Sequence, residues 1–346
     1  MTDATSPRRP ALELEGLALS LGRSGAPLVT DVSLAVSPGE MVGLVGESGS
    51  GKTLTGLAIS GLLPNAISVS SGRLRSGTTP WQQLRDGGRQ AGIAMVFQNP
   101  ATSLNPSMTV GRQLAEAYRI HHPGRRRAAV HAEVVDLLGR VRLPDPRRCA
   151  RSYPHQLSGG MKQRVMIAMA LACEPEVVIA DEPTTALDVS VQREVMDDLD
   201  RMRQEEGVGI LLISHDIALV GERCNRVLVM YAGELVETGS AQQVLTDPRH
   251  PYVHALLACT PERCRDISEL RALPGRVPQP GDVARGCRFA DRCARREPAC
   301  EVEDQHLTGL GPDRSVRCRV AVAAADRSSP WPPTAEPALE RGRRQA

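Results

Sequence analysis

Short apolar runs along the chain predict the buried strands of a sheet. Each run is four or five residues long, which suits a strand better than a helix. Near-continuous apolar strands are typical of parallel sheets that are covered on both faces. The predicted strands are Met41–Val45, Ile93–Phe97, Val177–Ala180, Ile210–Ser214 and Val227–Met230.

The segment ahead of these strands has a different pattern. Leu12–Val36 alternates apolar and polar positions, which is typical of antiparallel strands with one exposed face. Gly22–Pro27 supplies a turn within the segment. The sequence therefore predicts an antiparallel flank beside the parallel strands.

Helical periodicity fills most of the space between the predicted strands. It dominates from about residue 99 to residue 174, for example in Val110–Ile120 and Ala128–Leu138. A further helix-like segment, Leu54–Ser60, follows the first apolar strand. Strands that alternate with helices predict an α/β fold, here with a helical insertion.

Composition divides the chain into four stretches. Residues 1–10 predict a disordered lead, and residues 11–247 carry the strand and helix patterns. The helix-like Ala241–Thr246 ends before Pro248, after which the composition changes. Residues 248–320 form a C-terminal extension in which Leu273–Cys318 is rich in Pro, Gly, Arg and Cys and has little periodicity, and residues 321–346 predict a disordered tail.

Overall composition limits the classes of function. The net charge of +2 over 346 residues is too small to predict a nucleic-acid partner. No secretory signal is predicted in the polar stretch Met1–Pro10, and no apolar run is long enough to span a bilayer. We therefore expect the nine cysteines to be reduced thiols in the cytosol rather than disulfides.

A phosphate-binding loop is the first chemical motif. GESGSGKT at Gly46–Thr53 lies between the predicted strand Met41–Val45 and the helix-like Leu54–Ser60, which is the setting that this motif requires. Its glycines allow backbone N–H groups to surround phosphates, while Lys52 supplies a positive charge and Thr53 a hydroxyl for Mg²⁺.

Four further segments follow in a fixed order. They are Gln98, LSGGMKQR at Leu157–Arg164, VVIADEP at Val177–Pro183, and His215. Each alone has an ordinary structural explanation as a turn, a buried strand or a strand-terminal polar residue. Together with the phosphate loop, they resemble the ATP-binding cassette of ABC transporters. The resemblance implies an ABC-type P-loop ATPase core in residues 11–247, with a helical subdomain at about residues 99–174.

The resemblance implies a role for each motif. The phosphate loop and the acidic strand would bind Mg²⁺ and ATP, with Thr53, Gln98 and Asp181 at the metal. Glu182 would be the general base, Gln98 would contact metal and water, and His215 would contact the γ-phosphate. The residues assigned to nucleotide binding are Gly46, Glu47, Ser48, Gly49, Ser50, Gly51, Lys52, Thr53, Gln98, Asp181, Ser158, Gly159 and Gly160.

The signature residues Ser158, Gly159 and Gly160 imply a second cassette. In this family they contact the γ-phosphate bound to the partner, and residues 186–188 lie across the interface between the two cassettes. At the position where the family places an aromatic residue against adenine, this chain has Leu21. The change removes a stacking contribution of about 1 kcal/mol, so discrimination between bases would be weak unless another residue covers the base.

Four longer segments narrow the resemblance to one branch. They resemble the D-type ATPase of oligopeptide and dipeptide importers. The segments are VFQNPATSLNP, LSGGMKQRVMIAMAL with Met161, DEPTTALDVSVQ and RHPYVHALLACTP. That branch implies that this chain lies at the cytoplasmic face of the plasma membrane and has three kinds of partner: an F-type ATPase subunit, two membrane permeases and an extracytoplasmic substrate-binding protein. Close relatives import nickel, opines or glycosides, and a soluble non-transport ATPase is the remaining alternative.

The C-terminal extension contains a quartet of cysteines. Its members are Cys287, Cys293, Cys300 and Cys318, with five, six and seventeen residues between successive cysteines. Structural zinc sites favour more closely spaced pairs of cysteines, so this spacing fits zinc poorly. The importer branch implies a [4Fe–4S] cluster on this quartet, and four thiolates are the ligands that such a cluster requires. Zinc, or four thiols without metal, remain the alternatives.

Overall fold

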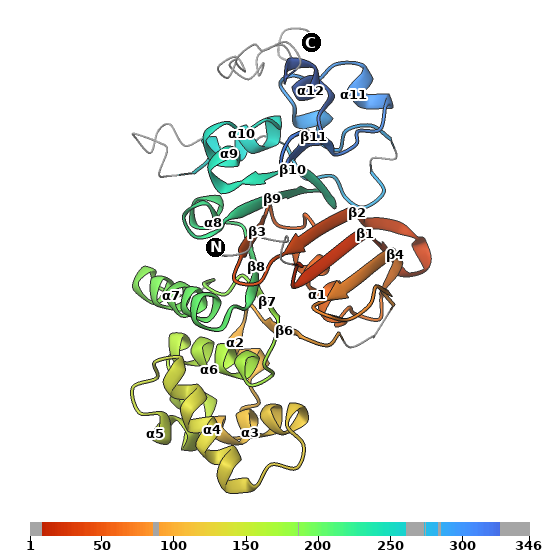
Figure 1. The fold of residues 1–346 in the computed structure, drawn as a ribbon. Helices are drawn as coiled ribbons and strands as arrows, with labels where there is room; N and C mark the ends of the chain where they lie inside the picture. The colour runs from red at the N-terminus through yellow and green to blue at the C-terminus, as the bar shows by residue number, and fades with distance from the viewer. Residues whose placement is uncertain are drawn as a thin grey trace, which may run out of the picture. The chain divides into compact units, whose positions relative to one another are not determined.

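The computed structural model describes residues 9–85, 90–185, 187–260, 273, 275–282 and 285–325 (Figure 1). The chain forms two compact units. The first unit consists of residues 1–17, 33–42 and 53–213, and the second of residues 18–32, 43–52 and 214–346. The chain passes from one unit to the other within β1 (Leu12–Leu21), β2 (Ala26–Val36) and β3 (Met41–Val45), and again at residues 52–53 and 213–214.

Most elements of the described chain belong wholly or almost wholly to one unit. In the first unit they are α1 (Lys52–Ser60), β4 (Ile67–Ser76), β5 (Gln82–Gln83), β6 (Ile93–Val96), α2 (Pro100–Ser103), α3 (Val110–His121), α4 (Arg127–Arg140), α5 (Pro146–Arg151), η2 (Pro154–Gln156), α6 (Gly159–Leu171), β7 (Val177–Asp181), α7 (Val189–Glu206) and β8 (Gly209–Ser214). In the second unit they are η1 (Gly22–Ser24), α8 (Ile217–Arg223), β9 (Arg226–Tyr231), β10 (Glu234–Ser240), α9 (Ala241–Thr246), α10 (Pro251–Ala258), η5 (Ala290–Arg292), α11 (Ala299–Val302), β11 (Thr308–Gly311), β12 (Arg314–Val316) and α12 (Arg319–Ala325).

Three predicted strands form the parallel part of the first unit. β7 pairs in parallel with β6 and with β8, so that Ala180 lies opposite both Val96 and Leu212. Every residue of β7 and of β8 is buried, which explains why their sequences are apolar without alternation. The prediction of an α/β fold with parallel core strands is confirmed, and Asp181 ends the middle strand of these three.

The predicted helical region is present as a group of packed helices. α3, α4, α5 and α6 contact one another in the first unit, and they form the yellow and green group in Figure 1. Val110, Leu114 and Tyr118 recur at helical spacing in α3 and are buried. The buried side chain of Gln113 bonds the backbone of Asn105 in both directions, which fixes the loop between α2 and α3.

The second unit contains an antiparallel sheet. β10 pairs with β9 on one side and with β12 on the other, and β12 pairs with β11. The predicted strand Val227–Met230 is therefore present as β9, with an antiparallel neighbour in β10. β11 and β12 come from residues 248–320, where the sequence predicts little regular structure. The C-terminal extension thus adds strands to the edge of an existing sheet instead of folding around a core of its own.

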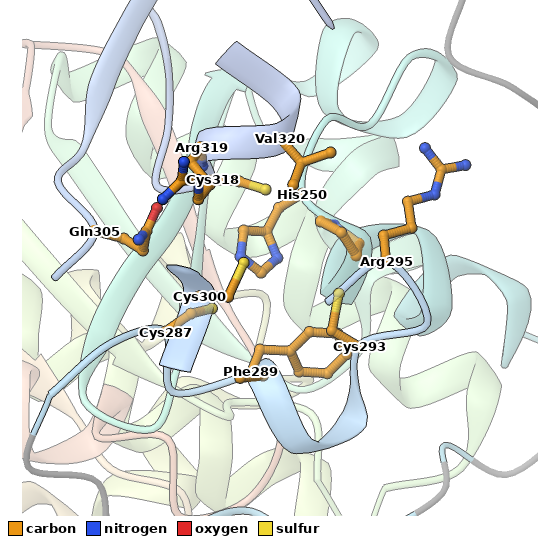
Figure 2. A pocket seen from close by; sticks show the side chains of 12 residues that line it. His250, Cys287, Phe289, Cys293, Arg295, Cys300, Gln305, Cys318, Arg319 and Val320 are labelled. Atoms are coloured by element: carbon orange, nitrogen blue, oxygen red, sulfur yellow. The ribbon is translucent and has the colours of Figure 1, made fainter. Parts of the chain in front are cut away.

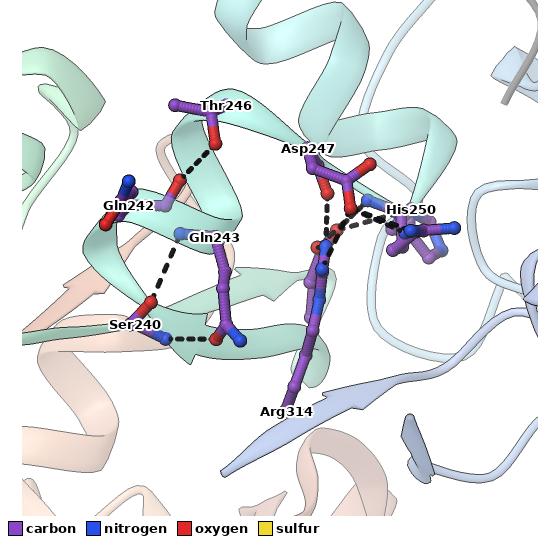
Figure 3. Close-up of polar contacts among 9 residues, drawn as sticks. Ser240, Gln242, Gln243, Thr246, Asp247, His250 and Arg314 are labelled. Atoms are coloured by element: carbon purple, nitrogen blue, oxygen red, sulfur yellow. Dashed lines mark hydrogen bonds and ion pairs between the residues drawn. The ribbon is translucent and has the colours of Figure 1, made fainter. Parts of the chain in front are cut away.

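Figure 3 shows the polar contacts that join the extension to this sheet. Ser240 and Gln243 form a capping box that starts α9. The carboxylate of Glu237 is completely buried and accepts hydrogen bonds from the backbone N–H groups of Arg249 and His250. The Arg314 side chain, from β12, reaches Glu237 at 3.4 Å and the Asp247 carboxylate at 3.1 Å.

Two observations bear on the ends of the chain and on membrane insertion. The predicted disordered tail at residues 321–346 begins too early, because α12 continues to Ala325. Ala321 is fully buried, and its packing gives the alanine-rich helix a support that composition does not reveal. Residues 1–8 and 326–346 lie outside the described residues. None of the helices that the structure describes combines the length and apolarity needed to cross a membrane.

Arg314 generates a prediction about stability. Arg314→Met should lower the free energy of unfolding by about 3 kcal/mol, because it leaves the Glu237 carboxylate buried without its cationic partner. Arg319→Met is the control, since Arg319 pairs with the exposed carboxylates of Glu297 and Glu303 and its loss should cost less than about 1 kcal/mol. Urea unfolding curves of the two variants that coincide would contradict the prediction.

Candidate functional site

The phosphate loop closes around the ammonium group of Lys52. Lys52 Nζ donates hydrogen bonds to the carbonyl oxygens of Gly46 at 2.8 Å and Glu47 at 2.9 Å, and lies 3.4 Å from Ser50 Oγ. The Lys52 side chain is buried, and Ser50 is completely buried. The loop therefore holds a positive charge at its centre, as phosphate binding requires.

Neighbouring backbone in the second unit supports the loop. The N–H of Gly233 donates to the carbonyl of Ser50 at 2.8 Å. A Cβ atom at Gly46 would lie 2.1 Å from the carbonyl oxygen of Met230. Only glycine allows the loop and β9 to approach this closely.

Thr53 and Asp181 meet in the first unit. The Thr53 hydroxyl donates to Asp181 Oδ1 at 3.1 Å, and Asp181 is buried at the end of β7. A hydroxyl and a carboxylate are hard oxygen donors of the kind that Mg²⁺ takes, usually with water completing its shell. Thr53 directly follows Lys52 in the chain, so the hydroxyl and the ammonium come from consecutive residues.

Glu182 is held in place by two side chains. Its Oε2 accepts a hydrogen bond from Gln98 Nε2 at 2.8 Å and another from the Thr185 hydroxyl at 2.9 Å. Its backbone has a positive φ of 45°, which is strained for a residue with a side chain, and its N–H donates to the carbonyl of Ile213. The structure therefore brings Gln98 and Glu182 together. Thr185 was not predicted, although it lies in the DEPTT segment.

The signature segment forms the start of α6. Ser158 caps the helix by accepting a hydrogen bond from the Met161 N–H at 3.3 Å. Gly160 packs so closely on α7 that an added Cβ would lie 2.4 Å from Val191 Cγ1.

The remaining predicted site residues have simpler surroundings. His215 lies between β8 and α8 with an exposed side chain. Leu21 is 42% exposed at the end of β1. Of residues 186–188, Ala186 lies outside the described residues and Asp188 caps α7. Hydrogen bonds from Ser190 and from the Val191 N–H lower the pKa of the Asp188 carboxyl.

The four predicted cysteines line one hollow in the second unit (Figure 2). Cys287, Cys293, Cys300 and Cys318 share it with the side chains of Phe289 and His250. The Cys287 N–H donates to the carbonyl of Cys300 at 2.7 Å, which links two of the four cysteine positions through the backbone.

Burial disfavours the charged forms of two thiols and one imidazole in the hollow. Burial first, and then the neighbouring thiols, raise the pKa of Cys287 to about 12 and that of Cys318 to about 11. Burial and then the charge of His254 lower the pKa of His250 to about 3. A bound cation would be required to ionise the thiols at neutral pH.

The quartet satisfies one requirement of a metal centre and not another. Four thiols that face one hollow match the donor set of a thiolate-held cluster in kind and number. Among the described residues, however, no group of three or more His, Cys, Asp or Glu side chains is arranged to hold a metal ion. The thiols would have to move closer together to share a metal or cluster.

Comparison with known families gives two matches. Residues 29–185 match the family described as "ABC transporter". Residues 236–300 match the family described as "Oligopeptide/dipeptide transporter, C-terminal region". The second match begins in β10 and includes three of the four cysteines.

Curated relatives align with almost the whole chain. The chain is 43% identical over 322 residues to the dipeptide transport ATP-binding protein DppD of Escherichia coli, which is 91% of this chain and 98% of that protein. It is also 43% identical over 319 residues to a putative peptide import ATP-binding protein of Brucella melitensis, which is 89% of this chain and 94% of that protein.

Solved structures with the same fold cover about two thirds of the chain. The cbiO1 protein of Clostridium perfringens, part of an ABC transporter complex, has a TM-score of 0.59 and 28% identity, over 69% of this chain and 91% of its own. The ATP-binding cassette MJ0796, in a dimeric post-hydrolysis state with ADP and Pi, has a TM-score of 0.56 and 25% identity, over 66% of this chain and 98% of its own.

Gly46 generates a prediction about nucleotide binding. Gly46→Ala should weaken binding of Mg²⁺ and AMP-PNP at least about tenfold, because the new methyl group collides with the Met230 carbonyl and displaces the loop. Gly207→Ala is the control: it introduces a side chain at a φ of +69° with open space around it, in the cap of α7. Calorimetric titration in which Gly46→Ala binds like Gly207→Ala would contradict the prediction.

Proposed function

Since the chain belongs to the ABC transporter family of ATPases, we propose that it is the ATP-binding and ATP-hydrolysing subunit of an importer for dipeptides or oligopeptides. The observation that carries this proposal is the extent of the similarity, which covers 98% of a dipeptide transport ATP-binding protein and includes the oligopeptide/dipeptide C-terminal region.

ATP and Mg²⁺ follow from membership of the family, and the contacts of this chain support a place for each. Lys52 and the backbone of residues 46–53 would bind the phosphates of ATP, supported by the start of α1. Thr53, Asp181 and Gln98 would hold Mg²⁺. Bound there, Mg²⁺ supplies positive charge that offsets the negative charge of the transferring phosphoryl group.

Glu182 is our candidate for the general base. Gln98 and Thr185 hold its Oε2, and the carboxylate so oriented would accept a proton from the attacking water. The bond between the water oxygen and the γ-phosphorus forms as the bond to the β–γ bridging oxygen breaks, and ADP and phosphate leave. His215 is our candidate for the γ-phosphate contact that follows β8.

The signature segment supports an assembly of two cassettes. Ser158, Gly159 and Gly160 begin a helix, so their N–H groups and the Ser158 hydroxyl can face the phosphate of a partner. The similar MJ0796 cassette forms a dimer with ADP and Pi. We propose an F-type ATPase subunit as the partner cassette, two membrane permeases on which the cassettes dock, and an extracytoplasmic substrate-binding protein.

The proposed location is the cytoplasmic face of the plasma membrane, where the chain would bind the permeases peripherally. The cargo assignment depends on the relatives, which are named for dipeptide and peptide transport. Nickel, opine or glycoside import would use the same ATPase mechanism. A peptide-stimulated ATPase activity in the assembled transporter separates the proposal from these alternatives.

We propose further that the cysteine quartet holds a [4Fe–4S] cluster. The shared hollow, lined by all four cysteines, supports a structural group distant in sequence from the phosphate loop. The extension has few large apolar residues, and a small segment of this kind needs a staple. Zinc on the same thiols, or metal-free thiols, are the alternatives that the second experiment below separates.

Glu182→Gln tests the proposed function. In the assembled transporter this variant should retain ATP binding but lose ATP hydrolysis and peptide uptake by a factor of about 10² or more, because an amide cannot accept the proton. Glu205→Gln, at an exposed position in α7, should leave both rates unchanged. Hydrolysis near the wild-type rate in Glu182→Gln would rule out this base.

The cluster is tested on protein purified without oxygen. The full chain should be brown and absorb near ~400 nm, as thiolate-held iron–sulfur clusters do. Cys→Ser at any of the four positions should remove the colour, whereas Cys173→Ser should not, because Cys173 lies outside the hollow and donates to the Met169 carbonyl. Colourless protein with stoichiometric zinc, or folded protein without metal, would contradict the cluster.

A further inference from the structure

The phosphate loop of this chain contains an acidic side chain. Glu47 directly follows Gly46, and its carbonyl accepts a hydrogen bond from Lys52 Nζ at 2.9 Å. A carboxylate beside a phosphate-binding loop repels the anionic ligand unless another charge offsets it. The electrostatics of the loop therefore depend on what Glu47 contacts.

Arg292 offsets this charge from the C-terminal extension. Arg292 Nη1 lies 2.8 Å from Glu47 Oε2, and Arg292 Nη2 lies 3.1 Å from Glu47 Oε1. The pair is bidentate, which is the strongest geometry between a guanidinium and a carboxylate. The Arg292 side chain is only 5% exposed, so solvent screens the pair much less than a surface ion pair.

Arg292 is itself fixed by aromatic residues. It donates to the Tyr231 hydroxyl at 3.2 Å and lies over the rings of Tyr231 and Phe289, 5.7 Å and 5.9 Å from their centroids. Burial alone would lower the pKa of Arg292, but the bonds to Glu47 and Tyr231 outweigh it and raise the pKa. The guanidinium is thus charged and oriented independently of any nucleotide.

A second contact holds the backbone of the same loop residue. The Glu47 N–H donates to the Tyr252 hydroxyl at 2.9 Å. Tyr252 is completely buried, and its ring lies 4.6 Å from that of Tyr231 and 5.5 Å from that of Phe289, between ring centroids. The backbone and the side chain of Glu47 are therefore both fixed by one aromatic cluster, to which the extension contributes Tyr252, Phe289 and Arg292.

We propose that Arg292 is a positioning residue for ATP binding: it neutralises Glu47 and holds the phosphate loop in its binding conformation. The inference rests on the proposed function, because it takes the loop to be the ATP site. It gives the C-terminal extension a direct part in the ATPase reaction. Cys287 and Cys293, on either side of Phe289 and Arg292, belong to the same short segment.

The test measures binding of Mg²⁺ and AMP-PNP to the full chain by calorimetry. Arg292→Met should weaken binding about tenfold, because the Glu47 carboxylate then repels the phosphates. In a chain that already carries Glu47→Gln, the same Arg292→Met change should alter the affinity less than threefold. Arg292→Lys keeps the charge but loses the bidentate geometry, and should bind between the wild type and Arg292→Met.

Arg288→Met is the matched control. Arg288 comes from the same segment of the extension, bonds the Ala232 carbonyl and the Thr30 hydroxyl, and pairs with Glu234 at 3.3 Å. None of the contacts that the structure describes for Arg288 reaches residues 46–51, so this variant should bind the nucleotide within twofold of the wild type.

Two results would overturn the proposal. One is wild-type affinity in Arg292→Met. The other is a loss of affinity that is equally large with and without Glu47→Gln, which would mean that Arg292 acts only by holding the extension folded. Lys52→Ala tests the proposed function separately. If this variant binds the nucleotide as tightly as the wild type, the loop is not the ATP site, and the proposal for Arg292 fails with the proposed function.

Discussion

A buried charge must have fixed partners, and this constraint determines where separate elements of the second unit contact one another. Burying an unpaired ion costs several kcal/mol, so each buried charged side chain draws several elements to one point. The Glu237 carboxylate joins β10, the start of α10 and β12. The Lys52 ammonium does the same within the phosphate loop, where the carbonyl groups of Gly46 and Glu47 close around it.

Pairing of this kind holds the C-terminal extension in addition to apolar packing. Within the second unit, its arginines donate hydrogen bonds to groups from distant parts of the chain. Arg288 bonds the Thr30 hydroxyl, Arg292 the Glu47 carboxylate and Arg317 the Leu235 carbonyl. Apolar contacts come from Phe289, which packs on Tyr231 and Tyr252, and from the buried Val253 and Leu257. The extension is therefore built onto the sheet of β9, β10 and β12 and lacks an independent core.

The sequence predicts those parts of the molecule that local patterns encode. The predicted strands at 93–97 and 177–180 end within one residue of β6 and β7, because an apolar run is itself the signal of a buried strand. β11, β12 and the Arg292–Glu47 pair were not predicted. Their partners are remote in sequence, and no local periodicity marks an arginine that pairs 245 residues away.

The environments of two consecutive acids show how one strand end can support two different roles. Asp181 is buried at the end of β7 with the Thr53 hydroxyl on its Oδ1, an environment suited to a metal. The positive φ of Glu182 turns the chain directly afterwards, and Gln98 and Thr185 both donate to one oxygen of its carboxylate. The two carboxylates thus have different partners. A sequence pattern identifies the acids, but only this turn explains why neighbouring residues of the same chemistry can take different parts in one reaction.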